Sequence, residues 1–181
     1  MGTNTHEIVH EIFRNHEQGV ILKLDYEKAY DRVNWDFLDE MLISRGFGAK
    51  WSMWIRKVVR GGSICVRIND ENGEYFKPGK GLRQGDPLSP LLFNLVVDVF
   101  TKMLEKVARE QLITGLLSEV CEGGIVSLQY ADDTLLFLTN NLHKARNLKW
   151  ILVCFEQLSG LKINYDKSDY RYGGGGGEQH G

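Results

Sequence analysis

The sequence predicts an α+β fold, in which an antiparallel sheet has helices packed on one face. Short apolar runs bounded by turn residues, at 19–25, 125–128 and 135–138, are typical of strands. Apolar residues recur at helical spacing in four longer segments, 34–44, 49–60, 89–110 and 142–159. With 181 residues the chain is long enough to bury the core of one such domain.

Local signals place the ends of several helices. Residues 6–17 favour a first helix. Asn34 is a suitable cap for the helix that runs to residue 44, and Gly46 is a suitable stop. Gly160 is expected to end the helix that begins near residue 142.

The remaining segments are shorter. Asn72-Gly73 is a typical hairpin turn, so 63–68 and 74–77 are expected to pair as two strands. Residues 161–164 are expected to form a short closing strand. The chain contains no visible internal repeat, and its glycine-rich end favours a flexible segment.

Adjacent aspartates lie in the turn of the hairpin at 125–138. Two carboxylates about 4 Å apart repel by about 4 kcal/mol at an effective dielectric constant near 20, and a divalent cation between them relieves this repulsion. Asp25 ends the strand at 19–25, so it can supply a third carboxylate to join Asp132 and Asp133. Three such groups can form a two-metal site for phosphoryl transfer. The alternative is that these are ordinary turn aspartates.

Four segments together resemble the reverse transcriptase domain of plant non-LTR (LINE-type) retrotransposons, with group II intron-type reverse transcriptases the nearest other group. They are LKLDYEKAYDRVNWDFL from Leu22, GLRQGDPLSPLLFNL from Gly81, QYADDTLLF from Gln129 and LSGLKINYDKS from Leu158, in the family's order and spacing. The resemblance implies a polymerase palm with part of the fingers over 19–168. Residues 1–18 would be a helix at the fingers/palm edge, and 169–181 a Gly-rich flexible tail.

The resemblance implies RNA-directed DNA synthesis, with an RNA template, a DNA primer and deoxynucleoside triphosphates as partners. Asp25 and Asp132 would be the principal ligands of two Mg²⁺ ions, for which Mn²⁺ can substitute, with Asp133 close to them. The backbone carbonyl of Tyr26 would be a further ligand. Substitution of either principal ligand is expected to abolish polymerisation.

The resemblance also implies where the nucleotide lies. Tyr30 would pack under the sugar and disfavour a 2′ hydroxyl by steric exclusion. Arg83, Gln84 and Gly85 would lie against the incoming nucleotide and the template, although Gly85 also favours a simple tight turn. Lys167 would lie near the triphosphate and neutralise or protonate the leaving pyrophosphate.

The charge pattern is uneven. The net charge of −2 argues against a nucleic-acid binder, yet residues 45–83 contain many more bases than acids. We therefore expect Arg56, Lys57, Arg60 and Lys80 to contact nucleic-acid phosphates. The alternative is that the first three form one solvated helix face.

A competing motif occurs near the start of the chain. His6-Glu7-Ile8-Val9-His10 matches the H-E-x-x-H pattern of zinc hydrolases, and His16 lies where some of these enzymes have a third histidine. Phe13 replaces the glycine that would turn the chain. In an unbroken helix His16 would lie about 9 Å beyond His10, too far for a shared ion. Zinc hydrolysis is therefore a minor alternative.

Other features bound the class of protein. No apolar run is long enough to span a bilayer, and no secretory signal is visible, so no membrane partner is expected. The three cysteines are scattered, which favours an intracellular protein, nuclear or cytoplasmic and not secreted. The sequence leaves the oligomeric state open. Because the upstream fingers and the thumb are not recognised, a catalytically inactive remnant or an RNA-binding fold is the main alternative.

Overall fold

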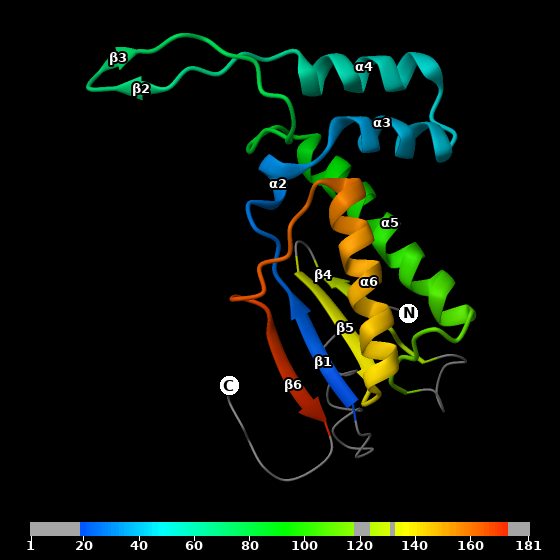
Figure 1. Ribbon diagram of the computed structural model, residues 1–181. Helices are drawn as coiled ribbons and strands as arrows, with labels where there is room; N and C mark the ends of the chain where they lie inside the picture. Colours follow the sequence, from blue (N-terminus) through cyan, green and yellow to red (C-terminus); the bar gives the residue numbers. More distant parts are fainter. Residues whose placement is uncertain (1–18, 118–123, 131–132, 174–181) are drawn as a thin grey trace. The chain divides into compact units, whose positions relative to one another are not determined.

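The computed structural model describes residues 19–117, 124–130 and 133–173 (Figure 1). The chain divides into two compact units, which are described separately. The sheet unit comprises 1–26, 100–154 and 163–181, and the helical unit comprises 27–99 and 155–162. The expected helix at 6–17 and the H-E-x-x-H motif lie outside the described residues, and so does Asp132.

The sheet unit is built on four antiparallel strands. Their order is β4-β5-β1-β6, so β1 lies between β5 and β6. The strands are β1 (Gly19–Leu24), β4 (Ser127–Tyr130), β5 (Asp133–Thr139) and β6 (Asp169–Gly173). The expected strand at 19–25 and the expected hairpin are confirmed, with shifts of a few residues at their ends.

Two apolar faces fix this sheet. Leu24, Leu136 and Leu138 alternate along the paired strands and are buried on one face. Figure 1 shows α6 (Leu142–Ser159) in front of the sheet, with α5 (Ser89–Arg109) beside it. On the opposite face a second cluster is formed by Ile21, Leu116, Leu117 and Phe137. Apolar packing therefore holds the sheet on both faces, as expected when apolar strands are combined with helices in one domain.

The helical unit contains three complete helices, a hairpin, the beginning of α5 and the last residues of α6. Its elements are α2 (Ala29–Arg32), α3 (Trp35–Ser44), α4 (Ala49–Arg60), β2 (Arg67–Ile68) and β3 (Glu71–Asn72). Figure 1 shows the β2–β3 hairpin extending away from the end of α4. The predicted helices at 34–44, 49–60, 89–110 and 142–159 are confirmed to within one residue at each end.

The predicted helix ends have the expected chemistry. The side chain of Asn34 accepts hydrogen bonds from the backbone N–H groups of Asp36 and Phe37, at 2.9 Å and 3.4 Å. Gly160 has φ +77, and a Cβ there would lie 2.6 Å from the carbonyl oxygen of Arg32. Only glycine combines that backbone conformation with so close an approach.

The turn of the hairpin differs from the prediction. β2 and β3 pair through Arg67↔Asn72 and Ile68↔Glu71, so the turn is Asn69-Asp70 and not Asn72-Gly73. Both turn residues have positive φ, 50 and 66, as a two-residue hairpin turn requires. Asn and Asp tolerate this conformation because their short polar side chains bond locally.

The end of the chain is also corrected. The flexible tail was expected from residue 169, but Asp169–Gly173 form β6 and pair with β1. The alternating Asp-Tyr-Arg-Tyr sequence suits an edge strand. The expected strand at 161–164 is reduced to a single bridge between Tyr26 and Ile163. Among the described helices, none is both long and apolar enough to cross a lipid bilayer.

We expect Asn34→Ala to lower the free energy of unfolding by about 1 kcal/mol, because α3 loses the acceptor for two backbone N–H groups. Urea unfolding followed by circular dichroism measures this. Asn140→Ala, at an exposed position, is the control and should leave the midpoint unchanged. Equal midpoints for the two variants would contradict the capping role.

Candidate active site

The register of the sheet brings two predicted acids together. Leu24 of β1 pairs with Thr134 of β5. Continued by one residue beyond this pair, the register would set Asp25 opposite Asp133, and directly opposed residues have Cβ atoms about 4.5–5.5 Å apart. The third acid, Asp132, lies outside the described residues. The geometry thus supports the predicted meeting of Asp25 with the acid hairpin.

A lysine lies on the same pair of strands. The ammonium group of Lys23 is 2.8 Å from the carboxylate of Asp133, and the two side chains are 45% and 41% exposed. Asp25 directly follows β1, two residues after Lys23, so alternation along the extended chain puts their side chains on one face. Sequence analysis missed Lys23. Its spacing from Asp25 is visible in the sequence, but its contact with Asp133 depends on the register.

The backbone of Asp25 is fixed by the turn at 164–168. Its carbonyl oxygen accepts a hydrogen bond from the Asn164 N–H at 2.8 Å, and its own N–H donates to Ser168 Oγ at 3.5 Å. Ser168 Oγ donates in turn to the Asn164 carbonyl at 2.8 Å. Lys167 belongs to this turn and is exposed. The structure therefore places the turn that contains Lys167 beside the Asp25 backbone.

Tyr26 is buried and pairs with Ile163 in an isolated antiparallel bridge. The hydrogen bonds flanking this bridge use the Asp25 carbonyl and the Glu27 N–H, so neither uses the carbonyl of Tyr26. Burial raises the pKa of the Tyr26 hydroxyl to about 12, and a hydrogen bond with Thr134 opposes this rise. The phenol is therefore neutral at physiological pH.

The donor set of this site suits a hard cation. Asp25 and Asp133 offer only carboxylate oxygens, the ligands that Mg²⁺ prefers. An ammonium already contacts Asp133, which shows that this carboxylate takes a cation. Within the described ranges no group of three His, Cys, Asp or Glu residues is placed to hold a metal ion. The predicted third carboxylate, Asp132, lies outside those ranges.

In the helical unit, Tyr30 and the loop at 81–85 are tied together. The Tyr30 ring stacks on Phe93, with centroids 4.9 Å apart and an angle of 25° between the planes. Its carbonyl oxygen accepts the Leu82 N–H at 2.7 Å. Gly81 has φ +92, and a Cβ there would lie 2.7 Å from the Asp31 carbonyl oxygen. Glycine at position 81 therefore permits the loop to lie directly against the Tyr30 segment.

The predicted nucleotide-binding residues Arg83, Gln84 and Gly85 are exposed in this loop. Gly85 has φ +86 and open space around its Cβ position, so the turn there is a backbone requirement. The Arg83 guanidinium lies directly against Gly62, where it occupies the place that a Cβ would take. The loop is thus set by backbone geometry and leaves its polar side chains facing solvent.

The predicted basic surface is partly neutralised within the chain. Arg56 donates to the Asp39 carboxylate at 2.9 Å, and Arg60 contacts Asp39 at 2.8 Å and Asp36 at 2.9 Å. These ion pairs join α4 to α3. Lys57 and Lys80 are exposed, so they fit the predicted role better than the two arginines do.

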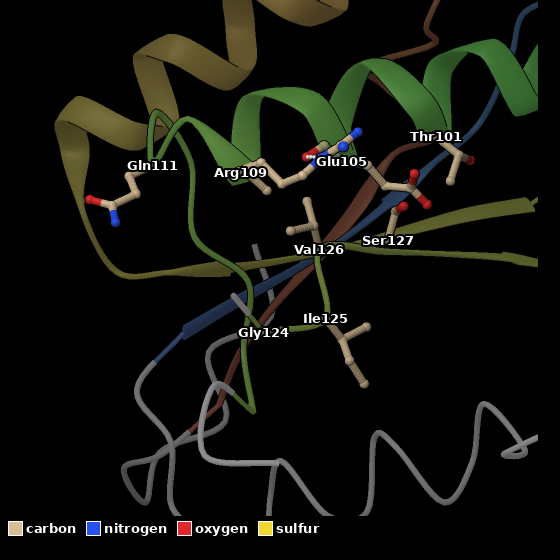
Figure 2. A pocket seen from close by; sticks show the side chains of 9 residues that line it. Thr101, Glu105, Arg109, Gln111, Gly124, Ile125, Val126 and Ser127 are labelled. Carbon is tan, nitrogen blue, oxygen red and sulfur yellow. Dashed lines mark hydrogen bonds between the residues drawn. The ribbon is translucent and has the colours of Figure 1, made fainter. Parts of the chain in front are cut away.

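One cavity in the sheet unit lies away from the acids. It has a volume of about 740 Å³ and is lined by the last turns of α5 and by residues 124–127. Figure 2 shows Thr101, Glu105 and Arg109 of α5 beside Val126 and Ser127. The cavity involves the beginning of β4, whereas the acid hairpin follows the end of β4. It is therefore not the carboxylate site.

Taken together, the antiparallel sheet and its helices define a polymerase-palm fold with part of the fingers. The chain belongs to the family described as reverse transcriptase (RNA-dependent DNA polymerase), which it matches over residues 1–173. This confirms the fold class and the family expected from the four motifs.

Individual relatives agree with this assignment. The chain is 30% identical over 149 residues to the transposon TX1 uncharacterized 149 kDa protein of Xenopus laevis, covering 81% of this chain and 11% of that protein. It is 29% identical over 147 residues to the Pol polyprotein of the retrotransposable element R2DM of Drosophila melanogaster, covering 81% and 13%. The chain thus spans a small part of the relatives it matches.

A solved structure shows the same fold. Apo telomerase from Candida tropicalis, truncated from its C-terminal domain, matches with a TM-score of 0.69 and 18% sequence identity. The match covers 98% of this chain and 37% of the telomerase chain. At this identity the likeness concerns the fold alone.

We expect Tyr26→Phe to flatten the loss of stability at alkaline pH. The folded state raises the pKa of the Tyr26 hydroxyl from 10.0 to about 12, so the unfolded chain loses this proton first. The stabilisation is complete below pH 10 and falls as the pH rises toward about 12. Urea unfolding across this range measures it, with Tyr75→Phe, at an exposed tyrosine, as the control. An equally steep loss in Tyr26→Phe and in the unsubstituted chain would contradict the assignment.

Proposed function

We propose that this chain is the nucleotidyl-transfer core of an RNA-directed DNA polymerase. It adds deoxynucleotides to the 3′ hydroxyl of a DNA primer on an RNA template. The observation that supports this most directly is the β1–β5 register, which sets Asp25 beside the acid hairpin. The family match over residues 1–173 supports the reaction class. Such substrates place the protein inside the cell, in the nucleus or the cytoplasm.

Asp25, Asp132 and Asp133, with the Tyr26 carbonyl, would hold two Mg²⁺ ions, which Mn²⁺ can replace. When bound, such ions activate the attacking hydroxyl and stabilise the charge of the triphosphate. The protein's contribution is to fix the carboxylates. Hydrogen bonds from the 164–168 turn hold the Asp25 backbone, and the buried Tyr26 ring holds the strand end beside it.

The nucleotide would be oriented by the helical unit. The ring of Tyr30, stacked on Phe93, would lie under the sugar and exclude a 2′ hydroxyl. Arg83, Gln84 and Gly85 would contact the nucleotide and template from the exposed loop. The carbonyl of Tyr30 fixes this loop through Leu82, so both elements would move as one part. Positioning of this kind supplies a large share of the rate in such reactions.

The remaining charges would bind phosphates. Lys167, exposed in the turn beside Asp25, would neutralise or protonate the leaving pyrophosphate. Lys57 and Lys80 would contact the nucleic-acid backbone. Arg56 and Arg60 would contribute less, because their guanidinium groups are shared with Asp36 and Asp39.

The isolated chain is expected to polymerise slowly. It spans 11% and 13% of the two relatives described above, and positioning of template and primer supplies much of the rate in such reactions. The second candidate is a protein that binds RNA without extending a primer. It is supported by the same observation, that the chain spans only a small part of these two relatives. The motif of the minor alternative, zinc hydrolysis through His6, Glu7 and His10, lies outside the described residues.

Asp25→Asn should lower single-nucleotide incorporation by about 100-fold, since a cation ligand is lost. The assay is extension of a primed RNA by excess protein with Mg²⁺ or Mn²⁺, and Asp132→Asn should behave alike. Asp70→Asn, in the exposed hairpin turn, is the matched control and should match the unsubstituted chain. If Asp25→Asn extends the primer as fast as Asp70→Asn does, the proposed chemistry is wrong. RNA binding without extension by any variant would favour the second candidate.

Tyr30→Ala should increase ribonucleotide incorporation relative to deoxynucleotide incorporation by about tenfold, because the excluding ring is gone. Tyr30→Phe keeps the ring and its stacking on Phe93, so it should retain the original ratio. The measurement is incorporation of each nucleotide type in parallel reactions. A ratio that is the same in both variants would show that Tyr30 only packs.

A further inference from the structure

The site contains a positive charge that the proposed chemistry does not use. The Lys23 ammonium lies 2.8 Å from the Asp133 carboxylate. A divalent cation at the same carboxylate would have to share it with this ammonium or displace it. The positive charge of Lys23 and its contact with Asp133 therefore affect how strongly the site binds a divalent cation.

The strand geometry explains why Lys23 reaches Asp133. Lys23 pairs directly with Leu135, and Asp133 lies two residues from Leu135 on β5. The contact is thus diagonal, across about 7–8 Å, which a lysine side chain can span. Asp25 directly follows β1, two residues beyond Lys23, so alternation puts it on the same face as Lys23. One ammonium is therefore placed beside two carboxylates that would otherwise repel each other.

We propose that Lys23 is a positioning residue that acts as a built-in counter-ion. Its ammonium holds the Asp133 carboxylate in the metal-free protein and gives it up when a divalent cation binds. The identity of that cation rests on the proposed function.

This exchange has a measurable cost for the cation. Binding must break the Lys23–Asp133 pair and place a divalent charge near an ammonium. The free site is therefore weak for divalent cations. The negative charge of a triphosphate offsets the ammonium, so nucleotide and cation load the site together.

Removal of the ammonium should tighten divalent binding to the nucleotide-free chain. We expect Lys23→Met, which keeps the alkyl chain, to lower the Mn²⁺ dissociation constant by about threefold or more, measured by water-proton relaxation. Lys149→Met changes the net charge equally at an exposed position of α6 and should have no such effect. An unchanged or raised dissociation constant in Lys23→Met overturns the proposal, as does equal tightening in Lys149→Met.

A second measurement needs no metal. In a double-mutant cycle of Lys23→Met and Asp133→Asn, the coupling should be about two- to fivefold in the unfolding equilibrium constant, and it should shrink in high salt. Lys23→Arg should keep most of it. If the coupling factor is indistinguishable from one, Lys23 and Asp133 do not interact and the proposal is overturned. Mn²⁺ binding that survives Asp25→Asn unchanged counts against the proposed function instead, while the cycle still decides the role of Lys23.

Discussion

The pairing register of β1 with β5 is the constraint on which the carboxylate site depends. In a strand successive side chains point to opposite faces, so a slip of one residue would turn Asp25 away from Asp133. The register is fixed by Leu24, Leu136 and Leu138, which are buried on the face opposite the acids. Apolar packing therefore positions the acids, and the acids contribute little to holding the strands.

The electrostatics of the site agree with this division of roles. The Lys23–Asp133 pair is nearly half exposed, and such pairs contribute only about 0.2–1 kcal/mol to folding. The pair matters because, in our proposal, its ammonium competes with a divalent cation for the Asp133 carboxylate. Asp25 is held differently, through backbone hydrogen bonds from Asn164 and to Ser168. One acid thus has a fixed backbone, while the carboxylate of the other is held by a side chain that can move away.

Most helices could be predicted from neighbouring residues. The hairpin turn and the Lys23 contact could not, because they depend on long-range strand pairing. Asn34 and Gly160 signalled helix ends because caps depend on neighbouring residues. The hairpin turn was misplaced because Asn69-Asp70 and Asn72-Gly73 are both acceptable turns, and only strand pairing decides between them. The meeting of Asp25 with the acid hairpin was expected from the family motifs. The contact of Lys23 required a register that no local pattern specifies.

The basic segment shows how folding changes an electrostatic interpretation. Within residues 45–83 the bases outnumber the acids, which favours nucleic-acid binding. In the fold, however, Asp36 and Asp39 of α3 lie outside that segment and pair with Arg56 and Arg60. Each phosphate contact adds about one to the dependence of log affinity on log salt. Because two of the four predicted contacts are already paired within the chain, the proposed nucleic-acid binding would depend less steeply on salt than the sequence alone implies.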